Sequence, residues 1–129
     1  MIGYATVGTN NLPLATAFYD KLFESINAKR VFVSEQGVVW SMSRISAGFG
    51  VFLPHDGQPA TVGNGSMVAL AMLSREQVDN FYAKAISLGA TDEGQRDHND
   101  RFYVNYFRDL EGNKLGVYYM TERRLKRRW

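Results

Sequence analysis

The feature that most constrains this chain is an internal repeat. Asn11 and Ser74 lie 63 positions apart, and each follows a short apolar segment and precedes a helical pattern, as N-cap residues do. The aromatic pairs Phe18-Tyr19 and Phe81-Tyr82 recur at the same spacing. Two caps and two aromatic pairs in register predict a chain built from two copies of one supersecondary unit.

Each copy predicts a strand, a helix and further strands. Apolar residues at helical spacing predict helices from Asn11 to about Ala28 and from Ser74 to about Gly89. Period-two alternation predicts a strand before each helix. Further strands are expected at 30–34, 38–44, 49–53, 102–108 and 114–120, with a polar loop at 92–101 and a hairpin at 109–113. This order predicts an α+β fold of two tandem βαβββ modules.

Length and composition indicate how the two units associate. The chain has 129 residues, of which 45% are hydrophobic and 22% charged, as in one ordinary globular domain. Neither half is large enough to bury its helix and sheet face alone. We therefore expect a single domain with a curved mixed sheet around a cleft and helices on the outer face. Its parts are module one at 1–53, a linker at 54–65, module two at 66–120 and a basic tail at 121–129.

Strand parity separates the side chains that face the helices from those that line the cleft. The helix-facing set is predicted to be Gly3, Ala5, Val7, Val68, Leu70 and Met72. The cleft-lining set is predicted to be Tyr4, Thr6, Trp40, Gly50, Phe52, Met67, Ala69, Gly116 and Tyr118. Trp40 joins this set as a stacking surface beside Arg44, and core packing is the alternative for it.

Three segments together resemble the vicinal oxygen chelate superfamily, which contains glyoxalase I, extradiol dioxygenases and bleomycin-resistance proteins. They are Thr9-Asn10-Asn11-Leu12 leading to Phe18-Tyr19, the halfway segment Asn64-Gly65-Ser66-Met67, and Phe107-Arg108-Asp109-Leu110-Glu111-Gly112-Asn113-Lys114. The last is similar to the family's Phe-x-Asp-Pro-x-Gly-Asn hairpin, with Leu110 in place of the usual proline. The resemblance covers essentially the whole chain. It implies the same fold and a homodimer, because these domains commonly pair so that two chains complete each cleft.

The resemblance also implies four metal-ligand positions, commonly His, Glu, His and Glu. The aligned residues are Tyr4, Gly50, Met67 and Gly116. Glycine offers no donor, a phenol is mostly protonated at neutral pH, and a thioether favours soft ions. We therefore expect no metal and no other cofactor, and a cleft that binds a small organic molecule. The two glycines predict open volume there, unless large neighbouring side chains fill it.

Two other classes of function stay open. One is a lyase, isomerase or dioxygenase-type enzyme of the same superfamily, and the other is a vestigial cleft that serves dimerisation only. For an enzyme, the catalytic candidates are Tyr103 and His98, which is flanked by carboxylates in a loop that family members bring over the cleft. A solvated surface loop is the alternative for His98, and His55 is assigned to a turn.

Charge and hydropathy limit the partners. The chain has no cysteine, no apolar run long enough to span a bilayer and no signal-peptide pattern at its start, so we expect a cytoplasmic protein without a membrane partner. The formal net charge is +2, and the positive charge is concentrated in the tail. Because the rest of the chain has no basic excess, we expect no nucleic-acid partner and interpret the tail as a solvated end.

Overall fold

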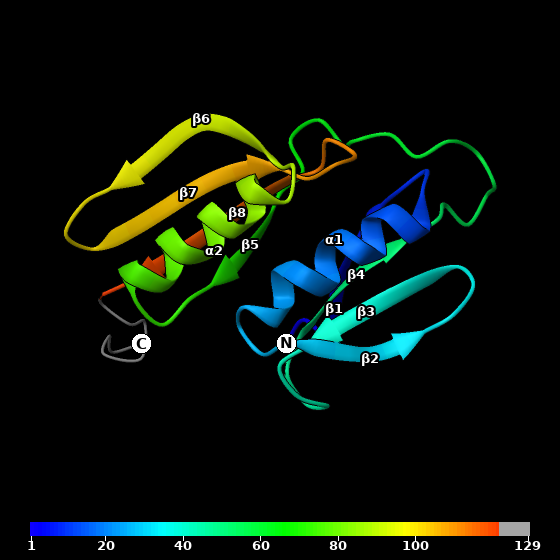
Figure 1. Cartoon of the computed structure of the whole chain (residues 1–129), viewed down its shortest axis with the longest axis horizontal. Helices are drawn as coiled ribbons and strands as arrows, with labels where there is room; N and C mark the ends of the chain where they lie inside the picture. Colours follow the sequence, from blue (N-terminus) through cyan, green and yellow to red (C-terminus); the bar gives the residue numbers. More distant parts are fainter. Residues whose placement is uncertain (122–129) are drawn as a thin grey trace.

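The computed structural model describes residues 1–121, except for the side chains of 95–97. The elements in chain order are β1 (Tyr4–Gly8), α1 (Leu12–Glu24), β2 (Lys29–Val33), β3 (Gly37–Ser41), β4 (Gly48–Phe52), β5 (Val68–Ala71), α2 (Arg75–Ser87), β6 (Thr91–His98), β7 (Phe102–Arg108) and β8 (Lys114–Met120) (Figure 1). This order confirms the α+β class and the two βαβββ modules. The prediction for the basic tail falls on 122–129, outside the described residues. Among the described helices, neither combines the length and the apolar character needed to cross a membrane.

Both helices begin at the caps that the repeat predicts. The side chain of Asn11 accepts a hydrogen bond of 3.1 Å from the backbone N–H of Leu14, and that of Ser74 accepts one of 3.0 Å from Gln77. Each bond satisfies a donor that the first helical turn leaves without a partner. After α2 the chain turns at Gly89, whose φ of +107° favours glycine. Helix α1 ends about one turn earlier than the sequence predicts.

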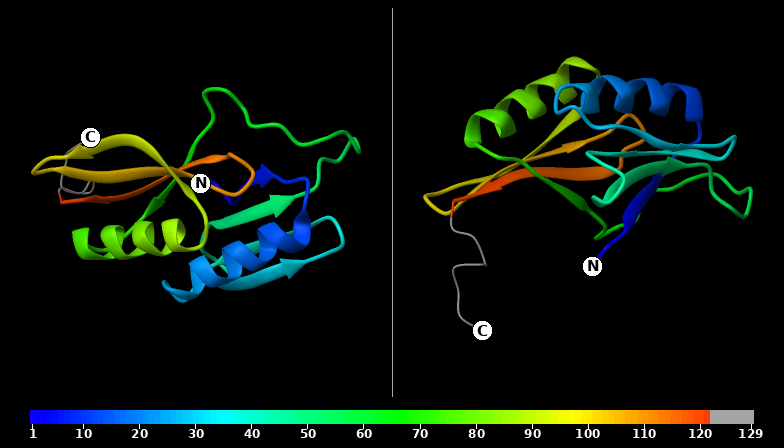
Figure 2. Two further views of the ribbon diagram at one scale, coloured as in Figure 1. Left: turned by 45° about the horizontal axis from the view of Figure 1, so that its top comes forward. Right: turned by 90° about the horizontal axis from the view of Figure 1, so that it is seen from below.

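The strands are divided into two four-stranded mixed sheets, one for each module. Their orders are β1-β4-β3-β2 and β5-β8-β7-β6. In each sheet the first and last strands of the module pair in parallel, whereas the other pairs are antiparallel. Both helices lie on the same side of the sheets (Figure 2). In the described part of the chain, the opposite face of each sheet is therefore left without a helix.

The segment expected to be a polar loop after α2 is instead strand β6. It pairs antiparallel with β7 and forms an edge of its sheet. Its residues Thr91, Asp92, Gly94 and His98 are exposed. An edge strand with little buried surface needs no alternation of apolar and polar residues, so its sequence does not carry the usual strand pattern.

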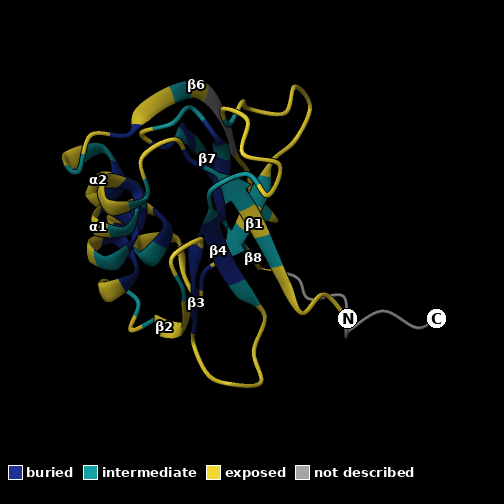
Figure 3. Cartoon of the chain, turned by 90° about the vertical axis from the view of Figure 1, so that its right-hand side faces the viewer, coloured by how far each residue is buried: buried dark blue, intermediate teal, exposed yellow. Residues whose placement is uncertain are grey.

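One apolar core joins the two modules between the helices and the sheets. The rings of Phe23 on α1 and Phe81 on α2 lie 6.3 Å apart between centroids, where the modules meet. Figure 3 shows the buried strands β3 and β4, in dark blue, beside the two helices. The buried members of this core are Ala15, Phe18, Tyr19, Leu22, Phe23, Val38, Trp40, Phe49, Val51, Met72, Val78, Phe81, Ala85, Ala90, Phe107, Leu115 and Val117. Both predicted aromatic pairs thus contribute to one shared core.

The hairpin between β7 and β8 ties module two to module one. The buried carboxylate of Asp109 accepts a hydrogen bond of 2.6 Å from the hydroxyl of Tyr19 on α1. It also accepts backbone N–H bonds of 2.9 Å from Glu111 and Asn113. The amide of Asn113 in turn donates to the carbonyl of Gly8 at 2.9 Å. Burial, and then the charge of Asp109, raise the pKa of Tyr19 well above its usual value, so the phenol stays protonated as the donor.

Candidate functional site

The side chains of β1 and β4 alternate between the two faces of the sheet as predicted. Val7 packs against the core, whereas Tyr4 and Thr6 are exposed on the other face. Gly50 and Phe52 occupy the same face on β4, because the residues that alternate with them are buried in the core. This side of the sheet, which carries no helix in the described part of the chain, is called the open face of module one.

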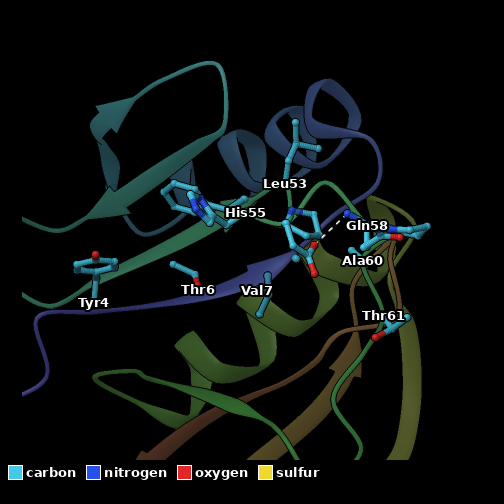
Figure 4. Close-up of a pocket in the computed structure, with 13 residues that line it drawn as sticks. Tyr4, Thr6, Val7, Leu53, His55, Gln58, Ala60 and Thr61 are labelled. Atoms are coloured by element: carbon cyan, nitrogen blue, oxygen red, sulfur yellow. Dashed lines mark hydrogen bonds between the residues drawn. The ribbon is translucent and has the colours of Figure 1, made fainter.

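A first hollow of about 570 Å³ lies between this open face and the linker (Figure 4). From β1 and β4 it is lined by Tyr4, Thr6, Val7, Gly8 and Phe52. The linker contributes Leu53, Pro54, His55, Asp56, Gln58, Pro59, Ala60 and Thr61. The imidazole, carboxylate and amide groups of the linker give this hollow a polar wall opposite the aromatic side chains.

The linker is held over the sheet by Asn10. Its side-chain amide donates to the carbonyl of Ala60 at 3.1 Å, and its side-chain oxygen accepts from the backbone N–H of Ala60 at 2.7 Å. This pair of bonds mimics the pairing of two strands and fixes the returning chain. As a result His55, which the sequence assigns only to a turn, lines the hollow. Sequence reasoning missed it because the contact joins residues fifty positions apart.

A second hollow, of about 390 Å³, lies on the same open face toward the loop at 42–47. It shares Tyr4 and Phe52 with the first hollow, so the two rings stand between the two spaces. Its full lining is Gly3, Tyr4, Val31, Phe32, Val39, Ser41, Ser43, Arg44, Ser46, Gly48 and Phe52. The rings of Phe32 and Phe52 stack with centroids 6.4 Å apart and an angle of 21° between planes. The hollow is thus largely apolar, with a single guanidinium at its rim.

The predicted cleft residues of module two lie on the corresponding face of the other sheet. A side chain at Gly116 would begin 3.2 Å from the ring of Tyr106 and 3.3 Å from the sulfur of Met67, so that space is already filled. Ala69 is exposed and Tyr118 is half-buried. None of these residues lines either hollow of module one. The predicted cleft residues are therefore divided between the two hollows of module one and the sheet of module two.

The four positions that the resemblance aligns with metal ligands do not fit a metal in this chain. A Cβ at Gly50 would lie 3.0 Å from the Phe52 ring, 3.0 Å from a methyl of Val39 and 3.2 Å from the carbonyl of Val38. The open volume predicted at the two glycines is thus taken up by neighbouring side chains. Within residues 1–121, leaving aside the side chains of 95–97, no three His, Cys, Asp or Glu side chains gather as a metal site. A phenol, a thioether and two filled glycine positions do not supply the donors of a divalent cation site.

Trp40 does not line the open face, which corrects the prediction. It is 2% exposed and belongs to the core. Its indole N–H donates to the carboxylate of Asp20 on α1 at 2.9 Å, and Arg30 donates to the same carboxylate oxygen at 2.9 Å. The hydrogen bond from Arg30 is the main cause of the lowered pKa of Asp20. Core packing, the alternative for Trp40, is therefore what the structure shows.

The two catalytic candidates, His98 and Tyr103, lie on the helix side of the module-two sheet and not on the open face of module one. Tyr103 packs against the core, and its hydroxyl donates to Asp79 on α2 at 2.8 Å. The His98 ring stacks on Tyr103 with centroids 3.9 Å apart, and its Nε2 lies 2.7 Å from the side-chain oxygen of Asn105. Alternation along β7 directs Tyr103 to the helix side of the sheet, and the imidazole follows it.

Comparison with known proteins gives matches among solved structures, whereas no family model and no curated protein matches the chain. A glyoxalase/bleomycin resistance protein from Albidiferax ferrireducens is 34% identical with a TM-score of 0.83, over 92% of this chain and 98% of that chain. A glyoxalase/bleomycin resistance protein/dioxygenase family enzyme from Burkholderia phytofirmans is 16% identical with a TM-score of 0.71, over 92% and 97%. A lactoylglutathione lyase from Agrobacterium tumefaciens is 20% identical with a TM-score of 0.67, over 92% of each chain. The last two likenesses concern the fold alone.

Proposed function

Since this chain belongs to the glyoxalase/bleomycin resistance protein family, we propose that it binds a small organic molecule without a metal on the open face of module one. The observation that carries the proposal is the contrast between the four metal-ligand positions and the surface beside them. The ligand positions lack donors or are filled, whereas the hollows on either side of Tyr4 and Phe52 are open. In this proposal the open face of module one binds the ligand, and the four aligned metal-ligand positions take no part in metal chemistry.

The chemistry of the two hollows supports binding of an amphipathic molecule. Aromatic rings provide large, rigid contact area at a small cost in side-chain entropy. Tyr4 and Phe52 offer this surface from the centre of the face, and His55 and Gln58 add hydrogen-bonding groups at the linker end. A mostly apolar hollow with a few placed polar groups is the usual form of a ligand site.

The competing proposal is that this face only pairs with a second copy of the chain. Exposed apolar side chains favour it, because Tyr4, Val31 and Phe32 leave much of their surface to solvent. Strands β1 and β5 are also edges of their sheets, where backbone groups are available for pairing. A homodimer and a ligand site are compatible if the second chain closes the hollow from above, and we propose this arrangement for the protein.

The proposal is tested by metal analysis and by a thermal-shift screen of small organic compounds, run with and without a chelator. We expect less than one metal ion per chain, and compounds that raise the melting temperature equally in both conditions. A ligand at a hundred times its Kd adds about 2.7 kcal/mol to the free energy of unfolding. Phe52→Ala should abolish these shifts, whereas Tyr106→Ala, on the filled face of module two, should keep them.

Two results would contradict the proposal. One tightly held zinc, nickel or iron ion per chain, with turnover of a hemithioacetal or a catechol that a chelator abolishes, would identify a metal enzyme. A dimer that no compound stabilises would instead support a face used for dimerisation only.

A further inference from the structure

The guanidinium of Arg44 lacks the carboxylate partner that two other arginines in the described part of the chain have. Arg30 pairs with Asp20, and Arg108 pairs with Glu93. Arg44 stands at the rim of the second hollow and has no hydrogen-bond or ion-pair partner among the described residues. An arginine fork without a partner beside an apolar surface is suited to a planar anion, which it can bind through two parallel hydrogen bonds.

We propose that the second hollow binds an aromatic anion, whose ring packs against Phe32 and Phe52 and whose carboxylate or similar acidic group pairs with Arg44. This inference rests on the proposed function and names the chemical class of the ligand. The occupant is thus a small aromatic acid.

The Phe52 ring, which forms the aromatic wall of the second hollow, lies in space that a side chain at Gly37 would occupy. A Cβ at Gly37 would lie 2.3 Å from the Phe52 ring, so only glycine lets this ring lie flat across β3. In that position the ring stacks with Phe32 on β2 and borders the hollow beside Tyr4. A flat wall of this kind matches a flat aromatic ligand in shape.

The loop that carries Arg44 is fixed by three serines. The hydroxyl of Ser41 lies 3.1 Å from the carbonyl oxygens of both Ser46 and Ala47 and can donate to either. The hydroxyls of Ser43 and Ser46 lie 2.7 Å apart, and that of Ser43 accepts the backbone N–H of Ser46 at 3.1 Å. The backbone under Arg44 is therefore ordered before a ligand arrives, which lowers the entropic cost of binding.

The charges of the two hollows favour an anion in the second one. Arg44 is the single charged side chain among the described residues that line it, so no carboxylate repels an acidic ligand. The first hollow, in contrast, contains Asp56. A neutral aromatic compound could use the same wall but would leave Arg44 without a partner.

The test compares naphthalene-2-carboxylate with its neutral isostere naphthalene-2-carboxamide by isothermal titration calorimetry. We expect the wild-type protein to bind the carboxylate about tenfold more tightly than the amide, as a charge-assisted pair predicts. Arg44→Gln should remove this preference while the affinity for the amide stays unchanged. Arg44→Lys should keep part of it, and Lys84→Gln, which removes an exposed cation on α2, should have no effect.

Three outcomes overturn the inference in distinguishable ways. Equal affinity for the two probes in the wild type and in Arg44→Gln rejects an acidic ligand but leaves the proposed binding function intact. A preference for the carboxylate that persists in Arg44→Gln also rejects the assignment of Arg44. If neither probe binds the wild type, the second hollow does not take an aromatic acid, whereas the proposed binding function is still decided by the thermal-shift screen.

Discussion

The two modules share one topology but differ on the side of the sheet away from the helices. In module one, the ring of Phe52 from the same strand and a methyl of Val39 from the neighbouring strand both close over Gly50, and a hollow lies on either side of Phe52. In module two, Tyr106 from the neighbouring strand and Met67 both close over Gly116. The comparison teaches that a duplicated fold does not duplicate its site.

The largest expected effect comes from the contact that joins the two modules. Asp109→Ala removes the buried acceptor of the Tyr19 hydroxyl and of the hairpin backbone. We expect the free energy of unfolding to fall by about 3 kcal/mol, because a buried phenol and two backbone N–H groups lose a charged partner. Urea denaturation followed by circular dichroism measures this loss.

The matched control for that variant is Asp79→Ala. Its carboxylate also accepts a tyrosine hydroxyl, at 2.8 Å from Tyr103, but at an exposed position. We expect a change below about 0.5 kcal/mol, as is usual for surface substitutions. If both variants lose a similar amount of unfolding free energy, the Asp109 contact does not stabilise the association of the two modules beyond what a surface contact does. The apolar core alone would then hold the modules together.

A smaller loss of unfolding free energy is expected from a substitution of Glu111, whose side chain is the second hydrogen-bonded link between the modules. Its carboxylate accepts the backbone N–H of Asn10 at 2.7 Å, the side-chain amide of Asn10 at 3.1 Å and the hydroxyl of Thr9 at 2.9 Å. The backbone bond from Asn10 is the main cause of the lowered pKa of Glu111. A lowered pKa means that the ionised form stabilises the fold. This stabilisation is present above the ordinary pKa of 4.5 and is lost as the pH falls through the folded-state pKa.

Glu111→Gln should therefore lower the free energy of unfolding by about 1.5 kcal/mol at neutral pH. The difference from the wild type should shrink as the pH falls below 4.5, the ordinary pKa of the group. Urea denaturation at neutral and at acidic pH measures both quantities. Glu24→Gln, at the exposed end of α1, controls for the change in net charge. A difference that is constant with pH would show that ionised Glu111 does not link the modules.

Much of the fold could be predicted because its signals are local. The two caps, the hairpin at Asp109 and the alternation on β1 each depend on neighbours within a few residues. Strand β3 gave no such signal for the orientation of Trp40. All five of its residues are buried, so alternation does not reveal which side faces the helices.

The parts of the site that escaped prediction depend on distant contacts. His55 lines the first hollow because Asn10 binds the returning linker, a contact that no local pattern encodes. The position of His98 follows from the stacking on Tyr103 across the β6–β7 hairpin. The filling of the two glycine positions likewise requires the paired strands to be in place. Sequence patterns identified the correct face of β1, but not which parts of that face stay open.

The smallest predicted effect addresses the comparison of the two faces directly. At Gly50 an added methyl group meets the backbone carbonyl of Val38 at 3.2 Å, which cannot move without disturbing the sheet. At Gly116 the nearest atoms belong to the side chains of Tyr106 and Met67, which can shift. We expect Gly50→Ala to cost about 1 kcal/mol of unfolding free energy and Gly116→Ala to stay within about 0.5 kcal/mol of the wild type, measured by urea denaturation. The reverse order would mean that module two is the more rigidly filled face, and that the space above Gly50 can adapt to a side chain after all.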